Sequence, residues 1–439
     1  MDNQENSRDY DLLIAGAGMA GVLLACRVRN LLPHLKIALL DRLPMVGGRL
    51  RHSYAHKDSW SLGFNTITPE LLTFLQRSFS SSPEELPEAE FQQGRQTALS
   101  ILSGQKSSEL FLGDLFTSKG VKEIAGSAAV AEWEKVEEAL QFNEEDKFTV
   151  FAKKLKLPKN SPIHSLLDLM SMILGIPDLW QATVYSIKQR MDYVSSLLVK
   201  GDWTQALQAL LQQEGRENPI DFIPSCLIVE SKHTDSGWKL VTEKGVYSGK
   251  VLAVSQSPWE AIKWLDQKPA STFFLSLAQK CQPVSLVTLT YKLADNPALP
   301  DVTWIPREGV QALYNYPGDL CLQALIEYEV SLESPSVVKA VRSLKRAFKK
   351  FTYEGKALEA SEEFIALHPY AWTQAPQAYF KRFIENFDYA KLNSKALLFC
   401  GDAYGDSYNP DRNLIRSLLA TCAAIGELEV LKDVKPLER

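Results

Sequence analysis

The pattern of apolar and polar positions predicts a strand, a tight turn and a helix at the beginning of the chain. Residues 12–15 form a short apolar run, which is typical of a parallel strand that is buried on both faces. Glycines follow, and a helix is expected from about Met19 to Leu32, with Pro33 just beyond its end. A second apolar strand ends at Asp41. This order predicts a βαβ unit in a parallel sheet.

The glycines have the spacing G-x-G-x-x-G, at Gly16, Gly18 and Gly21. In a dinucleotide-binding turn the first permits the tight turn, the second lets the backbone approach a pyrophosphate, and the third lets the helix lie close to the strand. The helix start, at Met19 and Ala20, offers free N–H groups and a positive dipole to a phosphate. The spacing favours a bound dinucleotide, and the alternative is a structural βαβ unit that binds nothing.

An acid and a second glycine pair extend this pattern. Asp41 lies twenty residues after Gly21, where a carboxylate accepts hydrogen bonds from an adenosine ribose and disfavours a 2′-phosphate. Gly47, Gly48 and Arg49 follow. The glycines let a loop pass over the dinucleotide, and the arginine can meet its phosphates. The other interpretation of Arg49 is a surface arginine after a turn.

Together these elements resemble the FAD-binding signature of the flavin amine oxidase superfamily. The superfamily includes amine oxidases, protoporphyrinogen oxidase, phytoene desaturases, renalase and the non-enzymatic Rab GDP-dissociation inhibitors. The resemblance implies an α/β fold, with a Rossmann-like, doubly wound FAD-binding domain and an inserted α+β substrate (cap) domain. The FAD-binding domain is expected from residues 1–75, 210–265 and 385–439, and the cap domain from 76–209 and 266–384.

The resemblance also implies roles for residues in later segments. Gly63 lies in a stretch that passes near the flavin ring, and Cys226 takes the place that contacts the adenine. Asp402 is expected to bond the ribityl chain. The last helix, from about Pro410 to Leu431, is expected to point its positive N-terminus at the N1–C2 edge of the flavin, where negative charge gathers on reduction. Arg412 is expected to add to this positive end, and Asp411 to oppose it.

The cofactor-binding residues that the resemblance implies belong to three separated blocks of the chain. They are Gly16, Gly18, Met19, Ala20, Gly21, Asp41, Arg42, Gly48, Arg49, Gly63, Cys226, Gly401, Asp402, Asn413 and Leu414. Tyr370 and Trp372 are candidate neighbours of the flavin ring, with packing alone as the alternative. No proton-transfer residue is indicated.

Three departures from the superfamily pattern weaken a plain amine oxidase assignment. The last helix has Leu414–Arg416 and Leu419–Ala420 where the superfamily usually has Glu-Gly-Ala and Ser-Gly. The apolar strand expected over 284–291 carries no lysine, whereas amine oxidases of the polyamine type place one on the comparable strand. No cysteine precedes Gly401 at the distance used for covalent attachment in monoamine oxidases, so non-covalent FAD is expected.

The rest of the chain divides by its periodicity. Residues 76–209 are expected to be largely helical, with helices over 130–140, 165–174, 178–198 and 204–213. The apolar stretch 165–177 is expected to be the core of a helical cap, with a substrate pocket or a peripheral membrane contact as alternatives. Strands are expected in 218–259 and 284–328. A basic amphipathic helix, expected over 336–351, fits a solvated face.

Composition adds limits to this picture. The chain has 439 residues, too many for one core, and a net charge of −5, which does not favour nucleic acid as a partner. No Sec-type signal and no transmembrane run are visible. The six scattered cysteines are expected to be buried free thiols of a cytoplasmic protein, and neither they nor the six histidines have metal-ligand spacing. The oligomeric state is not indicated.

The sequence therefore predicts an FAD-dependent oxidoreductase that transfers hydride from a small organic substrate, an amine or an apolar isoprenoid-like molecule, to the flavin. Two alternatives stay open. One is a renalase-like oxidase of reduced nicotinamides. The other is a binding protein of the Rab GDP-dissociation inhibitor type, which keeps the fold without redox turnover.

Overall fold

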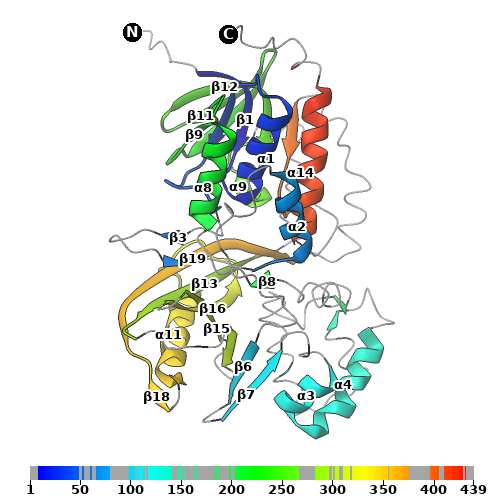
Figure 1. Ribbon diagram of the computed structural model, residues 1–439, viewed down its shortest axis with the longest axis vertical. Coiled ribbons are helices and arrows are strands. Elements are labelled where there is room, and N and C mark those ends of the chain that lie inside the picture. Colours follow the sequence, from blue (N-terminus) through cyan, green and yellow to red (C-terminus); the bar gives the residue numbers. More distant parts are fainter. Residues whose placement is uncertain are drawn as a thin grey trace.

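Two seven-stranded sheets dominate the computed structural model, and helices cover them (Figure 1). The description covers part of the chain. The described residues are 8–48, 52–53, 60–61, 66–79, 98–103, 106–111, 114, 117–140, 147–148, 150, 153, 163, 166, 183–184, 187, 197–198, 203–265, 282–295, 299, 302–305, 310–316, 319–353, 355–374, 396–404, 410–428 and 431.

The first sheet combines strands from the beginning, middle and end of the chain. Its order is β10 (Ile228–Thr234), β11 (Gly237–Thr242), β12 (Gly245–Val254), β1 (Arg8–Ala15), β2 (Ile37–Leu40) and β9 (Asp221–Ile223), with β20 (Leu397–Phe399) also paired to β12. Five of these strands run parallel, namely β9, β2, β1, β12 and β20, and β10–β12 form an antiparallel meander. The parallel part places the ends of five strands at one edge.

The parallel strands consist of consecutive apolar residues because both of their faces are buried. On one face Leu12 and Ile14 pack against α1 (Met19–Leu31), α14 (Pro410–Glu427), α8 (Trp203–Glu214) and α2 (Pro69–Ser78). On the other face Leu13 and Ala15 pack around Trp238, Trp264 and α9 (Pro258–Ala261). The expected α/β class is confirmed, and α9 is the one described helix that packs on the second face.

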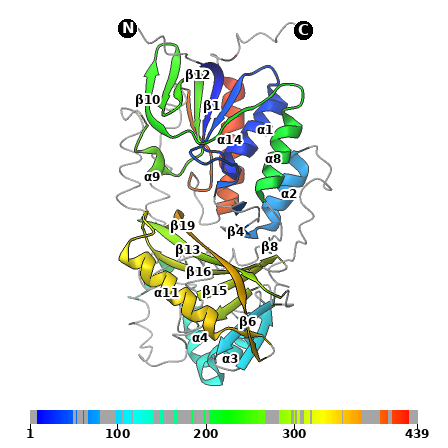
Figure 2. The ribbon, with the colours of Figure 1, turned by 90° about the vertical axis from the view of Figure 1, so that its left-hand side faces the viewer.

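The second sheet lies beyond the carboxyl ends of the parallel strands (Figures 1 and 2). Its order is β19 (Ala360–Gln374), β13 (Gln282–Leu293), β16 (Asp319–Glu327), β15 (Val310–Tyr316), β14 (Val302–Ile305), β6 (Ala98–Ser103) and β7 (Lys106–Phe111). All neighbours are antiparallel except β14 and β6. The helix α11 (Pro335–Lys350) covers one face, close to the range expected for the basic amphipathic helix.

Short elements complete the described part. The helices α3 (Ser118–Ala125) and α4 (Ser127–Leu140) follow β7. Three two-stranded pairs join β3 (His52–Ser53) to β4 (Trp60–Ser61), β5 (Thr66–Ile67) to β8 (Leu197–Leu198), and β17 (Thr352–Tyr353) to β18 (Lys356–Ala357).

The largely helical interpretation of residues 76–209 is wrong in two places. The hairpin of β6 and β7 lies inside that range, and Leu197–Leu198 form a strand where a helix was expected. β8 pairs with β5, which is distant in sequence. β6 pairs with β7, directly after it in the chain, and also with the distant β14. Most of the helices expected over 165–198 lies outside the described residues. The last helix ends at Glu427, four residues before the expected end.

The domain bounds given above stay a prediction. The strands of the first sheet lie within 8–40, 221–254 and 397–399, and those of the second lie within 98–111 and 282–374.

Candidate functional site

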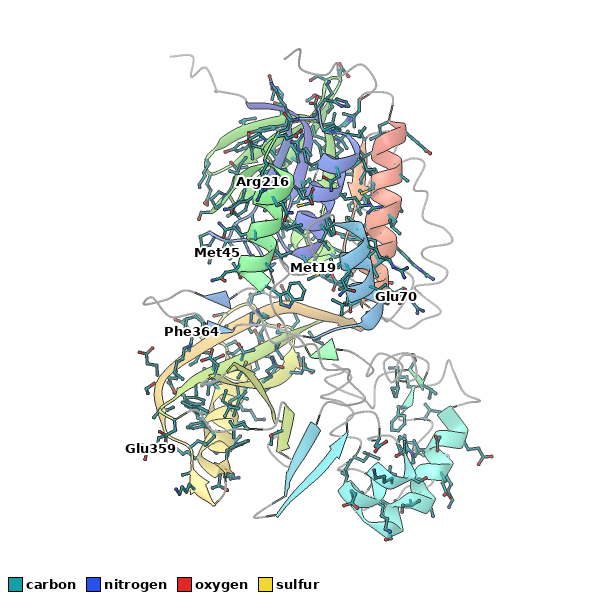
Figure 3. All side chains as sticks on the ribbon, in the orientation of Figure 1. Met19, Met45, Glu70, Arg216, Glu359 and Phe364 are labelled. Carbon is teal, nitrogen blue, oxygen red and sulfur yellow. The ribbon has the colours of Figure 1, made fainter. Side chains whose placement is uncertain are left out.

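The carboxyl ends of the parallel strands bring distant segments together at one edge of the first sheet. Gly16 follows β1, Asp41 follows β2, Ser255 follows β12, and Gly401 comes two residues after β20. Ligands of open parallel sheets bind at such an edge. Met19, in the first turn of α1, and Glu70, in the first turn of α2, both lie on the side that faces the second sheet (Figure 3).

The glycine-rich turn depends on the absence of side chains. Gly16 has a φ of 108°, a conformation that favours glycine. A Cβ on Gly21 would lie 1.9 Å from the carbonyl oxygen of Gly16, so α1 starts directly against the turn. Gly18 caps α1 without a side-chain hydrogen bond, and the first turn of α1 holds no acidic residue. The N–H groups at the start of α1 therefore offer a place for an anion.

The second glycine pair packs directly on this turn. Gly48 has a φ of 56°, and a Cβ on it would lie 2.9 Å from the Cα of Gly18. The N–H of Gly47 donates to the carbonyl of Ala17 at 2.9 Å. Both glycines of the G-G-R element thus bring two backbone segments into contact above the start of α1.

Asp41 holds the glycine-rich turn at the end of β2. Its Oδ2 accepts a hydrogen bond from the N–H of Ala17 at 2.6 Å, and its Oδ1 accepts one from the N–H of Leu43 at 2.8 Å. Both oxygens of Asp41 therefore hold backbone groups around this turn, and the expected ribose contact stays a prediction.

Cys226 lies beside Asp41, but its amide is already bonded. The N–H of Cys226 donates to the carbonyl of Asp41 at 2.7 Å, after Ser225, which has a φ of 49°. The thiol is buried, and burial raises its pKa. The expected adenine contact cannot use this N–H without breaking the bond to Asp41.

Ser255 is a site residue that the sequence analysis missed. Its hydroxyl donates to the carbonyls of Gly16 at 2.7 Å and of Ala15 at 3.1 Å, and its N–H also donates to Ala15 at 2.9 Å. It therefore fixes the glycine-rich turn from the neighbouring strand. A serine after an apolar strand is the only sequence signal, and it is too common to be used alone.

We expect Ser255→Ala to lower the free energy of unfolding by about 1–3 kcal/mol, because the Gly16 carbonyl loses the hydroxyl donor. Ser236→Ala is the control, since the Ser236 hydroxyl bonds only to Thr234 in an exposed turn, and its effect should stay within about 0.5 kcal/mol. Urea unfolding of both variants measures the difference. Equal effects would show that Ser255 does not support the turn.

The segment after β20 forms the last part of this edge of the first sheet. Gly401 has a φ of 148°, and a Cβ on it would lie 3.8 Å from that of Ala20, at the start of α1. Its N–H donates a hydrogen bond to the Ser417 hydroxyl at 2.9 Å. Asn413 donates its Nδ2–H to the carbonyl of Asp402 at 3.0 Å, which ties α14 to the loop. The structure thus brings Gly401, Asp402 and Asn413 together with the glycine-rich turn.

Two arginines near the expected site form ion pairs in the structure. Arg42 pairs with Glu260 at 2.7 Å, on the face that holds α9. Arg412, which was expected to support the helix terminus near the flavin, extends to Glu70 of α2 at 3.3 Å. Both arginines are about half exposed, so they make surface contacts between elements here.

The start of α14 holds an unexpected buried acid. Asp411 Oδ2 accepts a hydrogen bond from the N–H of Thr68 at 2.6 Å, and the Thr68 hydroxyl caps α2. Burial raises the pKa of Asp411 to about 6, against the two Thr68 hydrogen bonds, and the nearby Asp402 and Glu70 raise it further. Asp411 therefore joins the N-termini of α14 and α2.

The two leucines of α14 that replace small residues of the superfamily pattern differ in burial. Leu414 is buried in the apolar cluster between the first sheet and the helices that cover it, whereas Leu419 is 41% exposed. Neither is a small residue, so they do not supply the small side chains that the superfamily pattern has in this helix.

The flavin-ring candidates are only partly described. Arg49 and Gly63 lie outside the described residues. Tyr370 and Trp372 belong to β19, beside a bulge in which three residues face one of β13, and their side chains lie outside the description. Their expected roles stay predictions.

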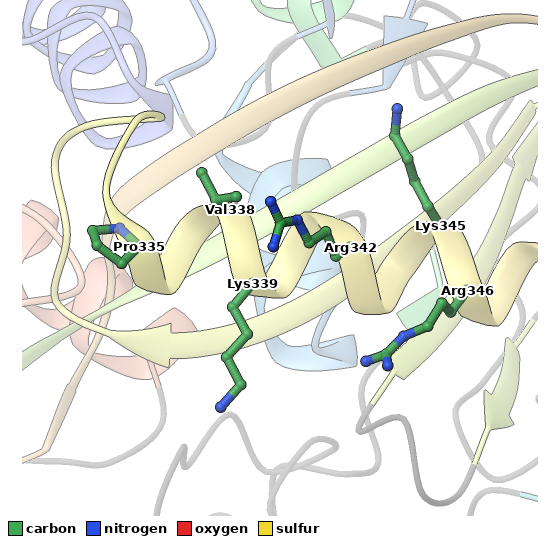
Figure 4. A pocket seen from close by; sticks show the side chains of 6 residues that line it. All are labelled: Pro335, Val338, Lys339, Arg342, Lys345 and Arg346. Carbon is green, nitrogen blue, oxygen red and sulfur yellow. The ribbon is translucent and has the colours of Figure 1, made fainter.

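Other features lie away from this edge. A hollow on the outward face of α11 is lined by Pro335, Val338, Lys339, Arg342, Lys345 and Arg346 (Figure 4). Among the described residues, no group of three His, Cys, Asp or Glu side chains could hold a metal ion. No described helix is long and apolar enough to cross a membrane.

The residues present fit a dinucleotide. A glycine-rich turn, a helix start without a side-chain cap and an acid at the end of the second strand are the features that a Rossmann-type fold presents to a pyrophosphate and a ribose. The edge thus defines the class, a two-sheet protein with a glycine-rich turn of the Rossmann type.

Comparisons with known proteins agree with this class. No protein-family model matches the chain. The lycopene beta-cyclase of Pantoea ananas is 41% identical over 60 residues, which are 14% of this chain and 16% of that protein. The match therefore spans about a sixth of the length of this curated relative.

Solved structures match almost the whole chain. Cyclohexylamine oxidase from Brevibacterium oxydans has a TM-score of 0.67 at 13% identity, covering 96% of this chain and 100% of that one. Putrescine oxidase bound to putrescine has a TM-score of 0.62 at 12% identity, covering 95% and 99%. An oxidoreductase from Methanosarcina mazei has a TM-score of 0.64 at 13% identity, covering 93% and 100%. The expected resemblance to the flavin amine oxidase superfamily is confirmed for the fold.

Proposed function

We propose that the protein is an FAD-dependent oxidoreductase that takes hydride from an organic substrate. The observation that carries the proposal is the edge where Gly16–Gly21, Ser255 and Gly401 meet. A Cβ at Gly16 or Gly21 would approach atoms of Ser255 or Gly16 closer than 3.0 Å, so glycine at both positions lets the helix start directly against the turn. Gly18, between them, places no side chain over the helix start, which supports a bound pyrophosphate there.

The chain's own residues have defined tasks in this proposal. The N–H groups at the start of α1 would bind the pyrophosphate, and Asp41 would bind the ribose while keeping the turn in place. Asp402 and the start of α14 would orient the ribityl end. When bound, FAD supplies the redox chemistry by accepting the hydride. The second sheet, as part of the inserted cap domain, would exclude water from the flavin end of the cofactor.

Non-covalent attachment is part of the proposal. The cysteine nearest to the loop that holds Asp402 is Cys400, which is fully buried, and burial raises its pKa. A buried protonated thiol is a poor nucleophile. All five described cysteines are free and buried, and Cys281 lies outside the described residues.

The names of the structural relatives support an amine or another small organic molecule as substrate. Cyclohexylamine oxidase and putrescine oxidase are named for amines, and the lycopene beta-cyclase for an apolar isoprenoid. Oxidation of an amine and dehydrogenation of an isoprenoid-like molecule therefore both stay open.

The visible absorption spectrum of the purified protein tests the cofactor. We expect a flavin spectrum that moves into the supernatant after heat precipitation, together with the mass of FAD. Flavin that stays with the precipitate would contradict non-covalent attachment. A colourless protein that also fails to take up added FAD would contradict the oxidoreductase and favour a binding protein without redox turnover.

A further inference from the structure

The two faces of the second sheet differ in chemistry. Alternate residues of a strand point to opposite faces. On β13, residues Val287, Leu289 and Tyr291 belong to the apolar cluster that packs against α11. Thr288 and Thr290 alternate with them, so they point to the opposite face. Both threonines are fully buried, so this opposite face is polar and yet hidden from solvent.

Neighbouring strands continue the polar face. Thr288 pairs with Gln323 of β16 and Ala366 of β19, and Thr290 pairs with Cys321. Gln323 is 3% exposed and donates its Nε2–H to the Cys321 sulfur at 3.9 Å. Thr290 and Gln323 both bond to the Cys321 side chain, while burial raises the pKa of its thiol to about 11. These three side chains therefore satisfy one another in part.

The hydroxyl of Thr288 does not take part in these hydrogen bonds. Its Oγ1 is buried and has no hydrogen-bond partner among the described residues. Buried polar groups are rarely left unsatisfied, because the loss of water is not repaid. A valine has the same shape and would remove this cost. The hydroxyl therefore indicates a partner that the described part of the chain does not supply.

The charges of this face limit the partner. Among its described residues, Lys292 and Asp319 form an ion pair with each other at 2.8 Å. Thr288, Thr290, Cys321 and Gln323 are uncharged. A buried ammonium group needs a compensating carboxylate. Asp319 is the one buried carboxylate on the described part of this face, and Lys292 neutralises it, whereas Glu327 and Glu362 of the same face are exposed.

The face also lies near the expected reacting end of the cofactor. The strand β4, which begins the segment with Gly63, contacts β16, the strand of Gln323. The bulge of β19 beside Tyr370 and Trp372 lies on the other side of β13.

We propose that the buried face around Thr288 and Gln323 binds an uncharged, oxygen-bearing group of the substrate, with the Thr288 hydroxyl as a hydrogen-bond partner. The assignment rests on the proposed function and selects, among its open substrates, a neutral molecule over an ammonium ion. Thr288 is a binding residue here and has no part in the chemical step.

The test compares two probes of the same shape, cyclohexanol and cyclohexylamine, on the protein as purified. Binding is followed by the shift in thermal unfolding temperature over a probe titration, which needs no turnover. We expect cyclohexanol to bind more tightly than the ammonium form of cyclohexylamine. We expect Thr288→Val to weaken cyclohexanol about fivefold, as for the loss of one hydrogen bond between neutral groups, and to leave cyclohexylamine unchanged.

Thr242→Val is the matched control. The Thr242 hydroxyl donates to the carbonyl of Gly245 in a turn of the first sheet, so the variant should unfold at a lower temperature and bind both probes as the wild type does. Thr288→Val should unfold at the same or a higher temperature, because it removes an unsatisfied group. Any of three outcomes would overturn the inference. They are unchanged cyclohexanol binding in Thr288→Val, no cyclohexanol binding in the wild type, and tighter binding of cyclohexylamine than of cyclohexanol in the wild type. The flavin spectrum is measured separately, so these outcomes are distinct from a failure of the proposed function.

Discussion

Replacing Gly21 with alanine is expected to remove FAD binding and to destabilise the first sheet. The added Cβ would lie 1.9 Å from the carbonyl oxygen of Gly16 and 2.7 Å from the hydroxyl of Ser255. Backbone cannot move aside as a flexible side chain can, so α1 must shift away from the turn. Overpacking of this kind costs about 3 kcal/mol or more when backbone atoms are involved. The shift also displaces the N–H groups that face the phosphates.

A matched glycine separates this effect from helix propensity. Gly426 lies near the end of α14, and a Cβ there would meet no atom within 4 Å. Gly426→Ala should change the free energy of unfolding by less than about 1 kcal/mol, in the stabilising direction. The measurements are urea unfolding and the ratio of flavin to protein absorbance. If Gly21→Ala keeps wild-type stability and flavin content, the contact between turn and helix does not have the assigned role.

Local patterns could be predicted from the sequence, and contacts between distant segments could not. The turn of Gly16–Gly21 was predictable because strand, glycines and helix are adjacent in the chain, and each obeys a steric rule. The support of this turn by Ser255 was not, because its partners lie 239 and 240 residues away. The pairing of β6 with β14, about 200 residues later, has the same character, but its hairpin with β7 is local and was missed as well.

Charges at element ends were the least predictable part of the site. The arginine of α14, Arg412, was expected beside the cofactor, but Glu70 lies within reach and pairs with it. Asp411 was expected to oppose the positive helix terminus. The sequence did not reveal that the N-terminus of α2 meets α14 there, since Thr68 and Asp411 are 343 residues apart.

Asp411→Asn should be more stable than the wild type at neutral pH, with a difference that shrinks as the pH falls. The folded-state pKa of Asp411 is raised to about 6 from the ordinary value of 3.8, mainly by burial. Its ionised form therefore costs stability above pH 6. As the pH falls from about 6 to about 4, the folded protein binds a proton that the unfolded chain does not yet bind, and the wild type gains stability. The difference between the two pKa values corresponds to about 3 kcal/mol.

Asparagine keeps an oxygen that can accept the Thr68 N–H and has no charge to titrate, so the comparison isolates the ionisation. Urea unfolding of both proteins between pH 8 and pH 4 measures it, because the other titrating groups cancel in the difference. Parallel curves over this range would show that Asp411 titrates normally and that the junction of α2 and α14 is open to water. Convergence toward pH 4 would establish a protonated acid at the helix terminus in mildly acidic solution. Below pH 6 the positive end of α14 would then face the cofactor site without an opposing charge on Asp411.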